Sequence, residues 1–260
     1  MREEFITQGD VEPLALSEGV ELQILVSAEQ GAKDLTTCLA SFQPGTQLPM
    51  HTHPTGEAIT LIEGTAEVLV ENRSYQLNAF DCMWVPAGIP HGVRNSSSAK
   101  AVFHTSFPTG AVERDFVDPP VESELHEATN GDVPETLTRL REDDMYEVSP
   151  GVRAQDLFAG RLGSNGVCGG YATFTSDGAL PCHVHDYDES ITIVAGTANC
   201  LVKGNRYQLS GNSTACVPTR RPHCFHNASQ EIMAMVWVYA GDEPDRQIVA
   251  EDLCEVATND

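Results

Sequence analysis

Two short histidine-rich stretches carry the residues whose types and spacing could do chemistry. The first reads His51-Thr52-His53-Pro54-Thr55-Gly56-Glu57, and His91 lies further along the chain. On a β-strand, alternate residues point to the same face, so the first two histidines face one side. The Pro-Thr-Gly segment favours a tight turn that would bring the glutamate back beside them. Three imidazoles and one carboxylate that converge in this way suit a divalent transition metal such as Fe, Mn, Ni, Co or Zn.

The same spacing occurs a second time. The residues His183, His185, Glu189 and His223 each lie 132 positions after their counterparts. The constant offset runs from Phe42 and Phe174 to Asn95 and Asn227, with many identical residues between them. A match of this length without net insertion indicates an internal duplication. We therefore predict two domains, residues 1–115 and 146–260, each with one divalent metal, joined by an acidic linker over residues 116–145.

The elements that must position these ligands are strands. Short runs of strand-forming residues, such as Ala58–Ile62 and Ala66–Val70, alternate with turn residues, and the second copy repeats them. This pattern predicts an all-β sandwich or barrel. In a small barrel alternate residues face inward, which is where a buried metal site can be built. Within the linker, residues 135–141 are expected to form a short helix.

Composition limits the partners and the location. The 260 residues include 38 acidic and 15 basic side chains, for a net charge of −23. Such a surface argues against nucleic acids and anionic membranes, and leaves a small-molecule substrate, with a homo-oligomer possible. No secretory signal is visible in Met1–Phe5, and no apolar run approaches the roughly 20 residues of a membrane span. The eight cysteines contain no CxxC pair. They are expected to be reduced thiols in a cytoplasmic protein.

The ligand stretches resemble the two motifs of the cupin family. The first motif, G-x5-H-x-H-x3,4-E-x6-G, is matched by Gly45, His51, His53, Glu57 and Gly64. The second motif is matched by Pro86, Gly88, His91 and Asn95, with Phe80 in place of its opening glycine. The second copy keeps the histidines and the glutamate, but Arg220 replaces the glycine before the last histidine. The chain thus resembles a bicupin of the germin-like kind.

The resemblance implies a jelly-roll barrel, or double-stranded β-helix, in each half. It also implies a metal held by three histidines and one glutamate, with two coordination positions left open. This fold hosts dioxygenases, decarboxylases, isomerases, lyases and non-catalytic binders, so the fold alone does not specify the reaction.

The favoured function is a metal-dependent enzyme of the dioxygenase type, acting on a small oxygen-rich molecule chelated at the metal. The alternatives are an isomerase, a decarboxylase or lyase, and a non-catalytic module that binds a small ligand. The surroundings of the second site are more polar than those of the first. Arg220 could pair with a substrate carboxylate, and Tyr187 could assist proton transfer. We therefore predict Arg220 and Tyr187 as catalytic residues, and the second site as the more active one.

Overall fold

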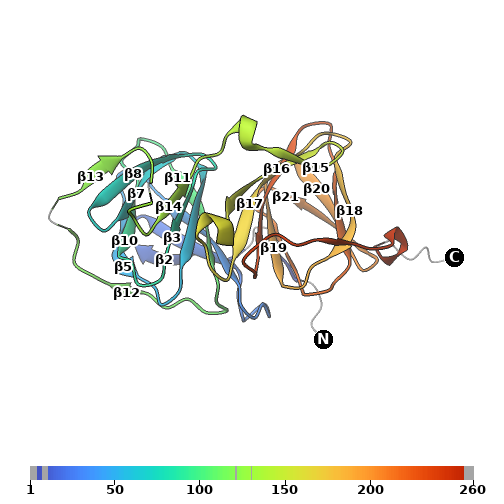
Figure 1. Ribbon diagram of the computed structural model, residues 1–260, viewed down its shortest axis with the longest axis horizontal. Helices are drawn as coiled ribbons and strands as arrows, with labels where there is room; N and C mark the ends of the chain where they lie inside the picture. Colours follow the sequence, from blue (N-terminus) through green and yellow to red (C-terminus); the bar gives the residue numbers. More distant parts are fainter. Residues whose placement is uncertain (1–4, 8–10, 121, 130, 255–260) are drawn as a thin grey trace.

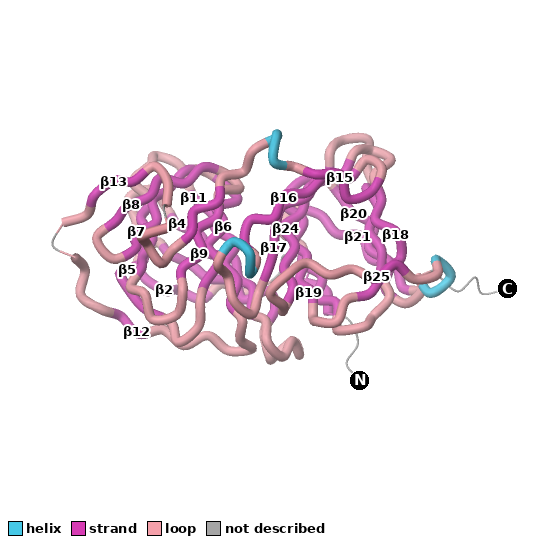
Figure 2. Tube along the Cα trace, viewed as in Figure 1, coloured by secondary structure: helices cyan, strands magenta, loops and turns pink. Residues whose placement is uncertain are grey.

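The chain consists almost entirely of β-strands. The computed structural model describes residues 5–7, 11–120, 122–129 and 131–254. Within these ranges the helices are three 3-10 turns at Glu142–Asp144, Gly160–Leu162 and Glu251–Leu253, and none is long and apolar enough to cross a membrane. Two barrels lie side by side along the long axis (Figure 1), and strands make up most of each (Figure 2). The predicted all-β fold with two tandem jelly-roll barrels is confirmed.

The first barrel is built from two sheets that face each other. The order in one sheet is β12 (Asp115–Phe116), β5 (Gln47–Thr52), β10 (His91–Arg94), β7 (Thr65–Val70), β8 (Arg73–Asn78) and β13 (Glu124–His126). The order in the other is β14 (Thr136–Thr138), β9 (Cys82–Val85), β6 (Glu57–Glu63), β11 (Ala101–Phe107), β4 (Thr36–Phe42), β3 (Val20–Val26) and β2 (Leu14–Ser17).

The second barrel repeats this plan. Its larger sheet has the order β1 (Phe5–Thr7), β22 (Thr214–Val217), β19 (Glu189–Ala195), β24 (Met233–Tyr239), β17 (Cys168–Phe174), β16 (Val152–Phe158) and β15 (Tyr146–Ser149). Its smaller sheet has the order β21 (Asn205–Ser210), β20 (Thr197–Val202), β23 (His223–Asn227), β18 (Ala179–Val184) and β25 (Gln247–Ile248). Every strand from β2 to β12 begins at the same constant offset before its counterpart from β15 to β25. The duplication therefore extends well beyond the histidine motifs.

The two copies exchange strands at their edges. The strand β1 precedes the first copy, but it pairs with β22 of the second barrel. The strand β14 precedes the second copy, but it pairs with β9, the equivalent edge of the first barrel. The exchange covers sheet edges that would otherwise offer unpaired backbone groups. It also ties the barrels together.

The acidic segment 116–145 consequently packs on the first barrel along much of its length. It supplies β13 and β14, and the Glu135 carboxylate accepts hydrogen bonds from Arg73 Nε and Tyr75 Oη, both at 2.6 Å. The helix expected over residues 135–141 is wrong. Long-range pairing with β9 and the ion pair to Arg73 outweigh the local preference. The predicted domain limits, at residue 115 for the first domain and residue 146 for the second, stay predictions.

A shared core joins the barrels in addition to their separate interiors. It includes Leu39, Trp84 and Val102 from the first copy, and Phe158 and Val236 from the second. Burial of this apolar area is the main force that holds the barrels together.

Polar groups are buried within the same interface. Thr37 Oγ1 lies 3.0 Å from Ser190 Oγ, and His104 Nε2 lies 3.2 Å from Thr192 Oγ1. Burial lowers the pKa of His104 to about 4. His104 is therefore a neutral interface residue at physiological pH.

One cysteine expectation is wrong. A disulfide joins Cys182 on β18 to Cys254 near the described C-terminal end, with the Cα atoms 5.9 Å apart. The two residues are 72 positions apart, so local spacing could not reveal the pair. The other six cysteines are buried and form no disulfide among the described residues. A cytoplasmic location stays a prediction, and residues 1–4, where no signal was found, lie outside the described ranges.

Candidate metal centres

The structure brings together the four predicted ligands of each copy. In the first barrel, His51 and His53 come from the end of β5 and the turn after it, and Glu57 opens β6. His91 opens β10 and faces His51 across the antiparallel pair. Ligand atoms of the four residues lie within 4.8 Å of one another, and all four residues are buried. The second barrel gathers its four ligands in the same way.

Backbone carbonyls orient all six ligand histidines, three in each barrel. In the first barrel, Nδ1 of His51 and Nδ1 of His91 each lie 2.8 Å from a carbonyl oxygen, of Pro49 and Ile89 respectively. His53 Nδ1 meets the Glu113 carbonyl. In the second barrel the carbonyl partners of His183, His185 and His223 are Pro181, Asp245 and Arg221. A carbonyl can only accept, so each Nδ1 carries a proton, which leaves Nε2 as the nitrogen that faces a metal.

The electrostatics favour the metal-binding protonation states of His51, His183 and the two glutamates. Burial is the largest cause that lowers the pKa of His51 to about 3 and that of His183 to about 2. Burial would also lower the pKa of His53 and of His185, but the neighbouring Glu57 and Glu189 outweigh it and raise both pKa values. Burial alone would raise the pKa of Glu57, but hydrogen bonds to His53 and His91 outweigh it and hold the pKa well below its usual range. Neutral imidazoles and an ionised carboxylate are the forms that coordinate metal.

The donor set fits a divalent transition metal. Several ligand atoms are buried without a hydrogen-bond partner: His53 Nε2, His185 Nε2, Glu189 Oε2 and His223 Nε2. In the second barrel, Glu189 Oε2 lies 2.8 Å from His223 Nε2 and 3.3 Å from His185 Nε2. Each buried polar atom without a partner costs roughly 1–3 kcal/mol. A cation in each barrel, among three nitrogens and one oxygen, would satisfy the atoms of that site, and Mn, Fe, Co, Ni and Zn accept such ligands.

The match to a family model agrees with this geometry. A model described as the cupin domain matches residues 38–107 and 170–239. The chain belongs to the cupin family. Because the model matches twice and each match contains one ligand set, the chain is a bicupin with two potential sites for a divalent metal.

Solved structures of oxalate decarboxylase share the fold. One covers 96% of this chain and 80% of its own, with a TM-score of 0.78 and 17% sequence identity. A second, of the Bacillus subtilis enzyme and its Mn(II) centres, covers the same shares with a TM-score of 0.77 and 16% identity. Among curated proteins, "Polyketide synthase CurC" of Streptomyces cyaneus is 28% identical over 109 residues, which are 41% of this chain and 71% of that protein.

The two sites differ in the space beside the ligands. The first site adjoins a cavity of about 20 Å³, and the second adjoins one of about 170 Å³. A single water needs roughly 10–15 Å³, whereas an engineered cavity of roughly 150 Å³ holds benzene. The first cavity thus has room for a water molecule, and the second has room for a small organic molecule.

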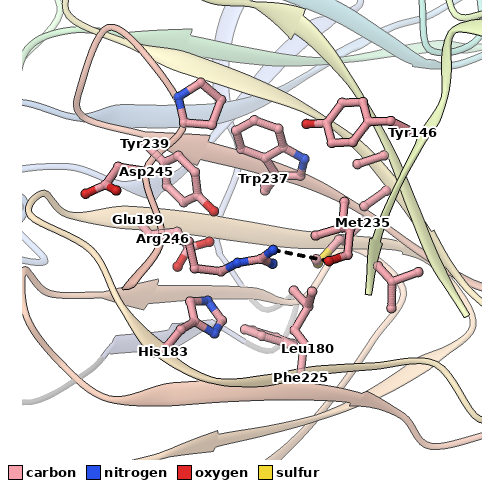
Figure 3. A pocket seen from close by; sticks show the side chains of 15 residues that line it. Tyr146, Leu180, His183, Glu189, Phe225, Met235, Trp237, Tyr239, Asp245 and Arg246 are labelled. Atoms are coloured by element: carbon pink, nitrogen blue, oxygen red, sulfur yellow. Dashed lines mark hydrogen bonds between the residues drawn. The ribbon is translucent and has the colours of Figure 1, made fainter. Parts of the chain in front are cut away.

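A cation reaches each site from a segment that sequence reasoning missed. Arg114 lines the first cavity and Arg246 lines the second. Figure 3 shows Arg246 reaching across the second cavity between His183 and Trp237. The two arginines are separated by the same offset as the ligand pairs, so the repeat could have revealed them if it had been followed past Asn227. Each arginine directly follows the residue whose carbonyl holds a ligand histidine.

The predicted catalytic residues lie elsewhere. Arg220 sits on a turn with a φ of 61°, and its guanidinium pairs with Asp186 and donates to Gln247 Oε1 at 2.8 Å. Its side chain is 55% exposed and does not line the second cavity. The backbone conformation of Arg220 turns its side chain toward solvent. The cation that faces this cavity is Arg246.

Tyr187 supports a ligand but does not line the cavity. Its ring stacks on His185 at a centroid distance of 6.1 Å, and its hydroxyl donates to the Glu243 carbonyl at 2.6 Å. Tyr239 lines the cavity, with its ring 4.4 Å from that of His185. Tyr239 lies beyond Asn227, where the comparison of the copies ended, and it occupies the place of Phe107 in the first barrel.

Proposed function

We propose that the chain is a metal-dependent enzyme of the dioxygenase type, and that its reaction takes place in the second barrel on a small oxygen-rich molecule. The observation that carries this proposal is a cavity of about 170 Å³ beside four convergent ligands and one arginine. The first barrel has the same ligands and an arginine, but the cavity that its ligands line is only about 20 Å³, and the cavity of about 290 Å³ that Arg114 also lines has none of the four ligands in its walls.

Four residues of the second barrel would bind the metal. His183, His185, Glu189 and His223 would hold a divalent metal. When bound, the metal would polarise oxygen atoms of the substrate and, if redox-active, would supply electrons for reaction with dioxygen.

Arg246 would bind an anionic oxygen of the substrate. Within the described residues, its one hydrogen bond runs from Nη2 to the Val148 carbonyl at 3.4 Å, which is long. The guanidinium has five donors in a planar fork, so most of them can face a ligand, and the fork matches a carboxylate.

The other side chains at the cavity favour oxygen chemistry over proton transfer. Isomerisation, decarboxylation and elimination each need a group that takes or delivers a proton. Burial is the main cause that raises the pKa of Tyr239 well above its usual range, so this hydroxyl stays protonated near neutral pH and is too weak an acid to suit proton transfer. Tyr146 donates its hydroxyl to Asp156 Oδ1 at 2.6 Å, and Asp245 points away from the cavity centre (Figure 3).

The test is a substrate screen with metal-reconstituted protein. Oxygen uptake, carbon dioxide release and isomerised product would be followed in parallel for small keto, hydroxy and enol acids with Fe, Mn, Co, Ni and Zn. Oxygen uptake that depends on Arg246 supports the proposal. Carbon dioxide release without oxygen uptake would identify a decarboxylase instead. Tight binding without turnover under every metal would identify a binding module.

A further inference from the structure

The second cavity has one charged end and an apolar body. The ligands His183 and Glu189 lie at the charged end, and Arg246 enters beside them and extends its guanidinium toward the Val148 carbonyl. The remaining walls are mainly hydrophobic and include Val148, Leu180, Phe225, Met235 and Trp237. Among the described residues that line the cavity, Arg246 is the only arginine or lysine. The cavity therefore offers one strong anion partner and a large dry surface.

We propose that the second site takes a monoanionic acid with a compact hydrophobic body, of the size of one six-membered ring. Its carboxylate and an adjacent oxygen lie at Arg246 and the ligand cluster, and its body fills the apolar end. This inference rests on the proposed function, which makes the second barrel the substrate site. It excludes small dianions such as oxalate as the preferred ligand.

The volume of the cavity and the charges of its lining together indicate this class of ligand. A volume of about 170 Å³ exceeds the roughly 150 Å³ that holds benzene, so a two-carbon acid would leave most of the apolar wall uncovered. A second carboxylate that lay beyond Arg246 and the ligand cluster would have to lie against Leu180, Phe225 or Trp237. Burial of a charge without a partner is strongly unfavourable. A hydrophobic body avoids that loss and gains the free energy of apolar burial.

A substitution between the copies opens the cavity. Ala154 on β16 occupies the place of Leu22 on β3, since each lies opposite an equivalent alanine, Ala172 or Ala40, across the strand pair. The shorter side chain removes three carbon atoms from the wall of the second cavity.

The aromatic wall of the cavity is also built by a matched pair. Trp237 lies opposite Gly170 on the neighbouring strand, where the first barrel has Thr105 opposite Cys38. A Cβ atom added at Gly170 would come within 2.7 Å of the Trp237 indole ring. The glycine thus makes space for the indole. The centroids of the indole ring and the Tyr239 ring are 4.9 Å apart and the rings are tilted by 37°, so two adjacent aromatic rings adjoin the ligand cluster.

Two acids with the same head test the proposal. Phenylglyoxylate and glyoxylate are both 2-oxo acids, and they differ only in the phenyl body. Binding to the Mn(II)-loaded full chain would be measured by calorimetry, and the electron paramagnetic resonance of Mn(II) would report contact with the metal. Phenylglyoxylate should bind at least about tenfold more tightly than glyoxylate or oxalate, because only its ring buries apolar area. Arg246→Ala should weaken all three.

Variants that carry first-barrel residues test where the body lies. Ala154→Leu should weaken phenylglyoxylate at least about tenfold and glyoxylate much less, since leucine fills the space that the ring needs. Met235→Phe, which introduces the residue found at Phe103, gives the same test if the first variant does not fold. Metal content would be measured in each.

The possible failures are distinguishable. This inference would be overturned if oxalate or glyoxylate bound as tightly as phenylglyoxylate. If Arg246→Ala still weakened their binding, the proposed function would stand. Phenylglyoxylate binding that neither Ala154→Leu nor Met235→Phe weakens would also overturn it, because the ring would then lie elsewhere. If no acid changes the Mn(II) spectrum and Arg246→Ala has no effect, the proposed function fails as well.

Discussion

The two barrels hold the same four ligands in the same geometry but differ in what surrounds them. In each barrel, backbone carbonyls anchor the ligand histidines, and an arginine lies directly before an edge strand, β12 or β25. The first leaves a cavity of about 20 Å³ and the second one of about 170 Å³. After duplication, a metal site can be retained in both copies while substitutions at a few wall positions, such as Leu22 and Ala154, decide which copy admits a ligand.

The second barrel alone has a covalent tie between a ligand strand and its cation-bearing segment. Cys182 precedes the ligand His183, and its partner Cys254 follows the segment of Arg246. The equivalent positions in the first copy are Met50 and Glu122. Removal of this disulfide would therefore make the second barrel more like the first.

Loss of the disulfide should have the largest effect on stability. The bond closes a loop of 72 residues, for which chain entropy predicts about 4 kcal/mol. Cys254→Ser should lower the free energy of unfolding by about this amount in denaturant titrations without reductant. The wild-type protein should show the same loss when reductant is added, and the variant should not. Equal stability of the two proteins without reductant would show that the tie is unimportant.

Acid should weaken the contact between the barrels through His104. Its pKa is lowered from 6.5 to about 4 in the folded chain, so the unfolded chain binds more protons between these values. The stabilisation is complete above pH 6.5 and is lost as the pH falls toward 4, by up to about 3 kcal/mol. His104→Gln should therefore show a flatter fall in the free energy of unfolding over that range.

His126→Gln is the matched control for the acid effect. His126 lies on β13, away from the barrel interface, and its ring contacts Tyr75. This variant should keep the full pH dependence of the wild-type protein. The same slope in His104→Gln would contradict the assignment to the interface.

The arginines should separate the two sites in function. Arg246→Ala should lower kcat/KM about 100-fold, since a charge-assisted pair to a carboxylate contributes roughly 1.5–3 kcal/mol. Arg114→Ala should stay within about threefold of wild type, because the cavity that Arg114 shares with the ligands is only about 20 Å³. Steady-state kinetics of both variants, with metal content equalised, would check this. A larger loss from Arg114→Ala would place the reaction in the first barrel.

Metal loss from the first barrel should leave the fold almost unchanged. The double variant His51→Ala with His53→Ala should bind one metal per chain instead of two by elemental analysis. Its circular dichroism should still show a folded β-protein, because the barrel interior rests on many buried apolar residues such as Leu61 and Val68. An unfolded spectrum would show that metal binding and folding are coupled in this barrel.

The sequence predicted the ligands and the fold because both depend on local spacing. The constant repeat offset places His51 and His183 equivalently, and the strand period sets which face they share. Arg246 escaped prediction because it lies beyond Asn227, the last predicted repeat position, and reaches the site only through the pairing of β25 with β18. The catalytic role of Arg220 stays a prediction, but its place three residues before His223 did not reveal the left-handed turn that directs its side chain to Asp186.

Long-range pairing accounts for the remaining differences. The exchange of β1 and β14 between the barrels depends on which sheet edges are open, and no local pattern encodes that. The disulfide joins Cys182 and Cys254 only because the final segment returns along β18.

The most direct test of a reaction confined to the second barrel compares His183→Ala with His51→Ala. Turnover of the same substrate would be measured at equal folding, with the metal bound at each site determined in both variants. Loss of a ligand exceeds the roughly 10–100-fold cost of an outer-shell change, so His183→Ala should reduce kcat/KM at least about 100-fold, and His51→Ala should have only a small effect. Equal losses, or a larger loss from His51→Ala, would contradict the account.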